Sequence, residues 1–195
     1  DYAIACWNGT GWEHVGPLDN TGWGGLGGNG GYGMINWGFG LGVYNNQLIS
    51  TGIIFAVAGV GLIYNYPTVC CEGAVGYDPV ANQYVQYGTN KADDAGWAIT
   101  VYNSNLFIGG GTGVSRWNPA TSTWSSIGSI SSGGFIYALE TYNNEIYAAG
   151  LFTSIGGFSA NNIAKWNGTS WSAIGGGVND AVVALKVFNS QLYVG

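Results

Sequence analysis

Two short patterns alternate along the sequence, and this repetition constrains the fold more than any other feature. The first pattern is a run of alternating apolar residues, an Asn-Asn or Asn-Ser pair, and a second alternating run. Asn tolerates the positive φ that two-residue hairpin turns require, so each copy predicts a β-hairpin. The copies are residues 38–52, 97–110, 137–150 and 183–195.

The second pattern places an aromatic residue before an Asn-Gly, Asp-Pro or Asn-Pro turn and another aromatic after it. Turn residues at a fixed offset between two short apolar runs again predict a hairpin. Because the aromatics recur at strand positions, packing between sheets explains them better than sugar binding. The copies are residues 3–16, 74–88, 114–128 and 162–175, with the pairs Trp7/Trp12, Tyr77/Tyr84, Trp117/Trp124 and Trp166/Trp171.

Hairpins that alternate strictly in two kinds, at the length of a propeller blade, predict an all-β chain. We expect a single four-bladed β-propeller over residues 1–195, built of four-stranded antiparallel blades, with one blade completed by joining N- and C-terminal half-blades. Pairing of the half-blades within one chain closes a ring, whereas pairing between neighbouring chains generates a filament. The expected blades are residues 181–195 plus 1–16, 37–88, 97–128 and 135–175.

Some copies resemble a known repeat. Gly109-Gly110, Val114, Trp117-Asn118-Pro119 and Trp124 resemble the Kelch repeat, in which a double glycine ends a strand and spaced aromatics surround a turn. The unit over residues 137–180 is similar to secreted bacterial Kelch-related arrays. This resemblance implies a propeller fold, but propellers host enzymes, lectins and scaffolds, so it implies no single function.

The charge inventory excludes several classes of partner and site. The chain has four basic and ten acidic residues, a net charge of −6 and one histidine, His14. No basic patch can neutralise a run of phosphates, which argues against nucleic acid as a partner. We expect no cofactor and no metal site, since His-cluster sites need more than one histidine. The longest apolar run, residues 53–63, is too short for a membrane helix, so we expect no membrane insertion.

An enzyme is the weakest of the functional hypotheses. A glycoside hydrolase needs two carboxylates at a defined separation, and Glu72, Asp93 and Asp94 are the candidates. The WNGTSW turn faintly resembles the Asp box of sialidases, but it has Asn in place of Asp. Sialidases also require an arginine triad, and Arg116 stands alone. We therefore predict a chain that is not an enzyme.

Loop residues outside the repeated pattern are the best candidates for ligand binding, because recognition concentrates in loops on a rigid scaffold. The alternative is that they only anchor their loops. We expect an extracellular or cell-surface module that is structural or adhesive and recognises glycan or protein; the alternative is a subunit of an extracellular filament whose partners are copies of itself. The candidates are Trp23, Tyr32, Tyr64, Tyr66, Asp93, Asp94, Phe152 and Phe158.

Two covalent features bear on the compartment. Cys6 can pair with Cys70 or Cys71 in an oxidising compartment, or all three can remain free thiols. Asn8 and Asn167 each begin an Asn-Gly-Thr sequon, which is a glycosylation acceptor and also a hairpin turn. The sequence starts with Asp1 and shows no signal peptide, so we expect a mature or trimmed product.

Overall fold

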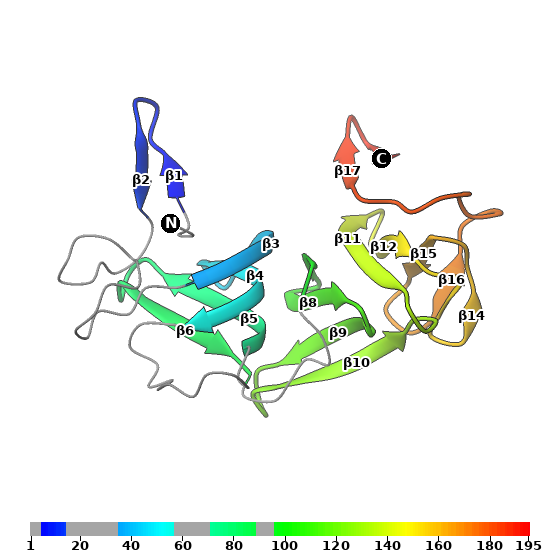
Figure 1. Ribbon diagram of the computed structural model, residues 1–195, viewed down its shortest axis with the longest axis horizontal. Helices are drawn as coiled ribbons and strands as arrows, with labels where there is room; N and C mark the ends of the chain where they lie inside the picture. Colours follow the sequence, from blue (N-terminus) through cyan, green and yellow to red (C-terminus); the bar gives the residue numbers. More distant parts are fainter. Residues whose placement is uncertain (1–4, 15–34, 57–70, 89–95) are drawn as a thin grey trace.

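The protein is all-β. The computed structural model describes residues 5–14, 35–56, 71–88 and 96–195, and these residues form antiparallel strands and turns without any helix (Figure 1). The described part of the chain accordingly has no helix that could cross a membrane. The all-β prediction is confirmed.

Three sheets have four strands each, and in each sheet neighbouring strands are paired in chain order. The first sheet contains β3 (Ile35–Tyr44), β4 (Gln47–Ala56), β5 (Cys71–Asp78) and β6 (Gln83–Tyr87). The second contains β7 (Ala98–Tyr102), β8 (Asn105–Gly110), β9 (Gly113–Asn118) and β10 (Thr123–Ser129). The third contains β11 (Phe135–Tyr142), β12 (Glu145–Leu151), β15 (Ile163–Trp166) and β16 (Trp171–Ala173).

A small hairpin interrupts the third sheet between its second and third strands. It consists of β13 (Ser154–Ile155) and β14 (Phe158–Ser159). Ile155 is completely buried and forms an isolated bridge to Ile130, the residue after β10. The insertion therefore ties the third sheet to the end of the second.

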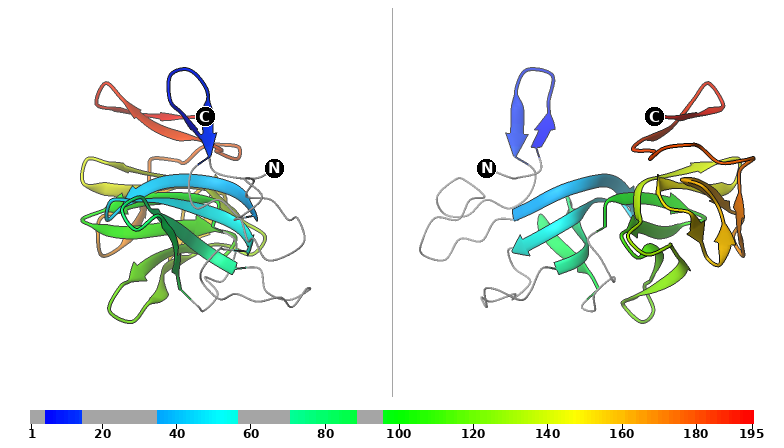
Figure 2. Two further views of the ribbon diagram at one scale, coloured as in Figure 1. Left: turned by 90° about the vertical axis from the view of Figure 1, so that its left-hand side faces the viewer. Right: turned by 45° about the vertical axis from the view of Figure 1, so that its right-hand side comes forward.

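Two further hairpins lie near the ends of the chain. The N-terminal hairpin is β1 (Ala5–Trp7) with β2 (Trp12–His14), and the C-terminal hairpin is β17 (Leu185–Phe188) with β18 (Gln191–Val194). Among the described residues, neither hairpin gains a third strand. The described sheets thus form no closed ring of four; they form an open arc, with both terminal hairpins on its open side (Figures 1 and 2).

The hairpins predicted from the first pattern, with the Asn-Asn or Asn-Ser turns, are confirmed, and so is the reason for their sequence. They are called the inner hairpins below. Both turn residues have positive φ in every copy: Asn45 and Asn46 have φ of 47° and 60°, and Asn189 and Ser190 have 47° and 58°. Two positive φ values in a two-residue turn match the right-handed twist of the flanking strands. The other two copies repeat these values, at Asn103/Ser104 and Asn143/Asn144.

The hairpins predicted from the second pattern, with an aromatic residue on each side of the turn, are also confirmed. They are called the outer hairpins below, and an Asn or Asp side chain organises each of their turns. The Asn167 Oδ1 atom accepts hydrogen bonds from the backbone N–H of Thr169 and Ser170, both at 3.0 Å, and from the Thr169 hydroxyl at 2.8 Å. Asn8 repeats the arrangement with Thr10 and Gly11. Asx turns of this kind explain why Asn or Asp occupies the position.

The core lies between successive sheets. The first strands of neighbouring sheets contact one another, β3 with β7, β7 with β11, and β11 with β17. Each junction encloses a cluster of buried apolar side chains; Ile49, Leu106, Ile136 and Ile146 are fully buried. Burial of this apolar surface is the main stabilising contribution in such a stack of sheets.

Tyr87 provides a pH-dependent signal at the first junction. Burial, with Tyr44 and Asp78 nearby, raises the pKa of the Tyr87 hydroxyl to about 12 from its usual value of 10.0. Because the unfolded chain loses this proton first, the stability that Tyr87 contributes is complete below about pH 10 and is lost as the pH rises towards about 12. We expect a late step in a phenolate absorbance titration that Tyr87→Phe removes. The exposed-residue control Tyr193→Phe keeps that step; its persistence in Tyr87→Phe would contradict the assignment.

Candidate interaction surfaces

A tryptophan crosses from each of the second and third sheets to the sheet before it. The Trp124 Nε1–H in β10 donates to the backbone oxygen of Tyr87 in β6 at 2.9 Å. The Trp171 Nε1–H in β16 donates to the backbone oxygen of Ile127 in β10 at 2.8 Å. Trp124 is the second residue and Trp171 the first residue of the last strand of its sheet, so the same contact recurs at two successive junctions.

The residue that follows each accepting carbonyl is a glycine, and the indole ring explains why. A Cβ at Gly88 would lie 2.9 Å from Cδ1 of Trp124, and a Cβ at Gly128 would lie 2.9 Å from Cδ1 of Trp171 and closer still to its Nε1. Only a residue without a side chain leaves room for the ring. We call this carbonyl and the glycine after it the Trp seat.

The N-terminal hairpin carries the same aromatic pair without a seat. In the third sheet, the paired residues Trp166 and Trp171 are 6% and 3% exposed. The equivalent residues of the N-terminal hairpin, Trp7 and Trp12, are 54% and 73% exposed. Their rings still contact each other, with centroids 5.5 Å apart. Two large aromatic side chains therefore lie open to solvent, although the corresponding pairs of the second and third sheets are buried.

A carbonyl and a glycine with the sequence of a third Trp seat follow the third sheet, and this Ile174 carbonyl accepts a hydrogen bond from the Gly177 N–H at 2.9 Å. The sequence Trp171-Ser172-Ala173-Ile174-Gly175 repeats the order of Trp124 to Gly128, so Ile174 and Gly175 correspond to Ile127 and Gly128. Within the described residues, no atom lies within 4 Å of a Cβ built on Gly175. This seat has no tryptophan over it.

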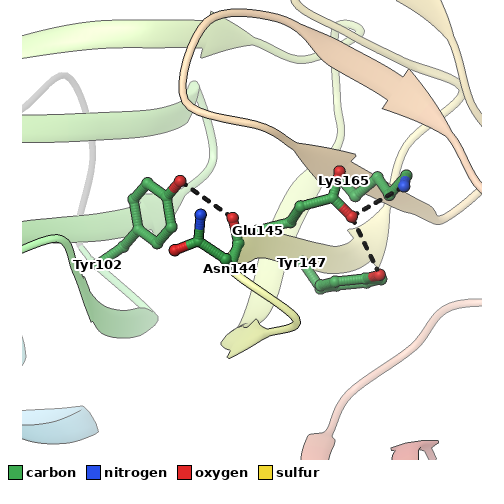
Figure 3. Close-up of polar contacts among 5 residues, drawn as sticks. All are labelled: Tyr102, Asn144, Glu145, Tyr147 and Lys165. Atoms are coloured by element: carbon green, nitrogen blue, oxygen red, sulfur yellow. Dashed lines mark hydrogen bonds and ion pairs between the residues drawn. The ribbon is translucent and has the colours of Figure 1, made fainter.

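A second kind of contact links the hairpin turns of neighbouring sheets. The Tyr102 hydroxyl donates to the backbone oxygen of Asn144 at 3.0 Å (Figure 3), and the Tyr142 hydroxyl donates to the backbone oxygen of Ser190 at 3.0 Å. The ring of Tyr102 also packs against Trp166 of the third sheet, with centroids 5.9 Å apart. The second and third sheets therefore each present an aromatic pair, Tyr102/Phe107 and Tyr142/Tyr147, to the strands that follow. We call the side of a sheet or hairpin that points to the following one its forward face.

The forward face of the C-terminal hairpin is exposed. Phe188 and Tyr193 pair with ring centroids 6.2 Å apart, as Tyr102 and Phe107 do at 6.3 Å. Unlike Tyr102 and Phe107, which are buried, Phe188 and Tyr193 are exposed. Exposed aromatic patches of this kind mark interaction sites.

The side of a sheet that points to the preceding sheet is its backward face, and on the first sheet this face is exposed. In the second sheet Ile99 faces backward and packs against the backbone at Gly40 and Gly42 of β3. Leu41 stands at the position of β3 that Ile99 has in β7, and it is exposed, as is Val43. The arc therefore ends in two apolar faces whose equivalents contact each other at the inner junctions.

A lysine and a glutamate of the third sheet form an ion pair. The Lys165 Nζ lies 2.8 Å from Glu145 Oε2, and the Tyr147 hydroxyl donates to the same oxygen at 3.5 Å (Figure 3). The hydrogen bond to Glu145 raises the pKa of Lys165, and burial raises the pKa of Tyr147. Partly exposed pairs of this kind add little stability. Among the described residues there is no cluster of three potential metal-ligating side chains.

Of the predicted ligand-binding residues, the structure describes two. Phe152 is 2% exposed and packs in the core between the second and third sheets, so it anchors its loop and offers no surface to a ligand. Phe158, in β14, is 49% exposed. The others, Trp23, Tyr32, Tyr64, Tyr66, Asp93 and Asp94, lie outside the described residues and stay predictions.

The structure describes some of the predicted cysteine and sequon sites. Cys6 is an exposed free thiol in β1, Cys71 begins β5, and Cys70 lies outside the described residues, so the disulfide stays a prediction. Asn8 and Asn167 are exposed in their hairpin turns.

Sequence reasoning missed the Trp seats, although a signal was available. Each outer hairpin ends in an aromatic, two further residues, an apolar or aromatic residue and a glycine, as in residues 84–88 and 124–128. The recurring glycine could have been recognised as a point of close approach.

No family model matches the chain, and no curated protein matches it.

Proposed function

We infer that the chain is a non-catalytic propeller module in which the two terminal hairpins form a fourth four-stranded sheet. The observation that carries this inference is the pair of exposed end faces, Phe188 and Tyr193 at one end and Leu41 and Val43 at the other. Their equivalents pack together at the inner junctions, so joining the ends buries both faces with contacts of the kind already present.

The role of such a ring is structural or adhesive, at the cell surface or outside the cell. The low charge supports this role, because only 7% of the residues are charged and the partner must be recognised by stacking and hydrogen bonds. The resemblance to Kelch repeats also supports a propeller, while leaving the ligand open to glycan or protein. Exposed Phe158 lies on the inserted hairpin, in the kind of loop that carries recognition.

A glycan array tests the adhesive role. We expect the parent chain to bind a subset of glycans, and Trp23→Ala, Tyr64→Ala or Phe158→Ala to abolish that signal without lowering the melting temperature. Val80→Ala is the matched control, since Val80 is an exposed apolar residue in a turn of the first sheet. If all three variants bind as the parent does, the predicted sites are wrong.

A filament subunit is the second candidate, favoured by one observation. The two terminal hairpins of the described structure stand apart at the two ends of the arc (Figure 1). The same end faces could therefore be buried by neighbouring chains, and a head-to-tail contact that does not close generates a filament.

A further inference from the structure

We propose that the N-terminal hairpin docks onto the C-terminal hairpin of its own chain, with β1 paired to the open edge of β18 and the Trp12 indole in the third Trp seat. This inference rests on the proposed function and specifies how the fourth sheet is built. The surface formed by the open edge of β18 and the third Trp seat fits an outer hairpin, and we assign it to β1–β2.

The register of the new pairing follows from the complete sheets. Their second and third strands pair with Leu48 opposite Tyr77 in the first sheet and Ile146 opposite Trp166 in the third. Leu48 and Ile146 each stand four residues after the aromatic before the turn, and Leu192 does so in β18. Trp7 has the position of Tyr77 and Trp166. Leu192 therefore lies opposite Trp7, and Tyr193 opposite Cys6.

The same alignment brings Trp12 to the third sheet. In the described junctions, the tryptophan opposite the third-strand aromatic reaches back to the preceding sheet, as Trp171 does from its position opposite Trp166. Trp12 lies opposite Trp7 in the N-terminal hairpin. Once β1 lies beside β18, Trp12 faces Ile174 and Gly175, and its Nε1–H can donate to the second lone pair of the Ile174 carbonyl, which also accepts from the Gly177 N–H.

Docking buries side chains that otherwise have no reason to be apolar. Trp7 and Trp12 are the most exposed tryptophans of the motif, and the preceding sheet offers them Tyr147, the equivalent of Phe107 beneath Trp166. The unpaired N–H and C=O groups on the edge of β18 would also gain partners, which removes an edge prone to uncontrolled pairing.

The position of the N-terminal hairpin favours docking within its own chain over docking onto a second copy. Both terminal hairpins stand on the open side of the arc in every view (Figures 1 and 2). The arc curves towards closure, and a segment tethered to the same chain is present at a high effective concentration.

A single introduced thiol tests the register and the source of the hairpin together. Tyr193→Cys places a thiol directly opposite Cys6, whose own thiol is free and exposed. Directly opposite residues of an antiparallel pair have Cβ atoms close to the separation that a disulfide needs. The dilute 195-residue chain is oxidised mildly and digested, and the linked peptides are identified by mass spectrometry. The control carries Cys6→Ser together with Tyr193→Cys.

We expect a disulfide between Cys6 and the introduced thiol in the monomer fraction, and its loss in the control. The same link found only in covalent dimers or larger species would overturn the proposal in favour of a second copy. Absence of the link, with the introduced thiol reactive towards a thiol reagent, would overturn the docking itself. Glycan binding by the parent chain is measured separately: absence of the docking removes the fourth sheet, whereas absence of glycan binding removes the adhesive role alone.

Trp12→Ala gives an independent test that does not depend on cross-linking. If Trp12 occupies the seat, the melting temperature falls by several degrees, whereas Val80→Ala, the loss of another exposed apolar side chain, leaves it unchanged. An unchanged melting temperature for Trp12→Ala would overturn the proposal.

Discussion

Trp171→Ala is expected to lower the free energy of unfolding by about 4 kcal/mol, the cost typical of removing a large buried aromatic side chain. Trp171 is almost fully buried between the second and third sheets, and its indole N–H donates to the Ile127 carbonyl. Truncation leaves a cavity at the junction and a carbonyl without this donor, so both effects act in the same direction.

Denaturant titration of Trp171→Ala measures this loss, and Ser172→Ala is the matched control. Ser172 is the next residue of β16 and is exposed, so its truncation should change the free energy of unfolding by less than about 0.5 kcal/mol. Trp171→Phe separates the two effects, because it keeps most of the ring volume and removes the N–H. A loss below about 1 kcal/mol for Trp171→Ala would show that the Trp seat does not hold the junction.

Gly128→Ala is expected to cost about 3 kcal/mol, at the upper end of what overpacking in a core costs. A Cβ at this position would overlap the Trp171 indole, which is also closely approached by the backbone at Gly156. The ring cannot move away without breaking its hydrogen bond to the neighbouring Ile127 carbonyl. The variant therefore disrupts the seat while leaving Trp171 itself in place.

Gly176→Ala is the control for this substitution. Its Cβ meets nothing within 4 Å among the described residues, and its φ lies outside the positive range that penalises side chains. Comparison of the two melting temperatures removes the general effect of replacing glycine with alanine, which reduces the entropy of the unfolded chain. Equal melting temperatures would contradict the geometry of the seat.

The local structure could be read from the sequence because its causes are local. The Asn-Asn and Asn-Ser pairs fix their turns through positive φ, and the Asn side chains of the outer turns are bonded within three residues. The repetition predicted that the paired aromatics pack between sheets, and Trp117, Trp124, Trp166 and Trp171 are buried as expected. Trp7 and Trp12 share the pattern but are exposed in the structure, so for them this prediction is wrong.

The contacts between sheets could not be predicted in the same way. Trp124 finds its acceptor 37 residues earlier in the chain and Trp171 finds its acceptor 44 residues earlier, and only the stacking of the sheets brings them together. The burial of Phe152 has the same origin. Its position in a loop suggested exposure, but the inserted β13–β14 hairpin folds back and places the ring in the core.

Electron microscopy of the purified chain in negative stain tests the central claim most directly. If the N-terminal hairpin completes the fourth sheet within its own chain, isolated particles are compact discs of a single size, and Trp12→Ala shifts them towards open forms. Fibres, or a parent population of open arcs that Trp12→Ala leaves unchanged, would contradict the closed ring.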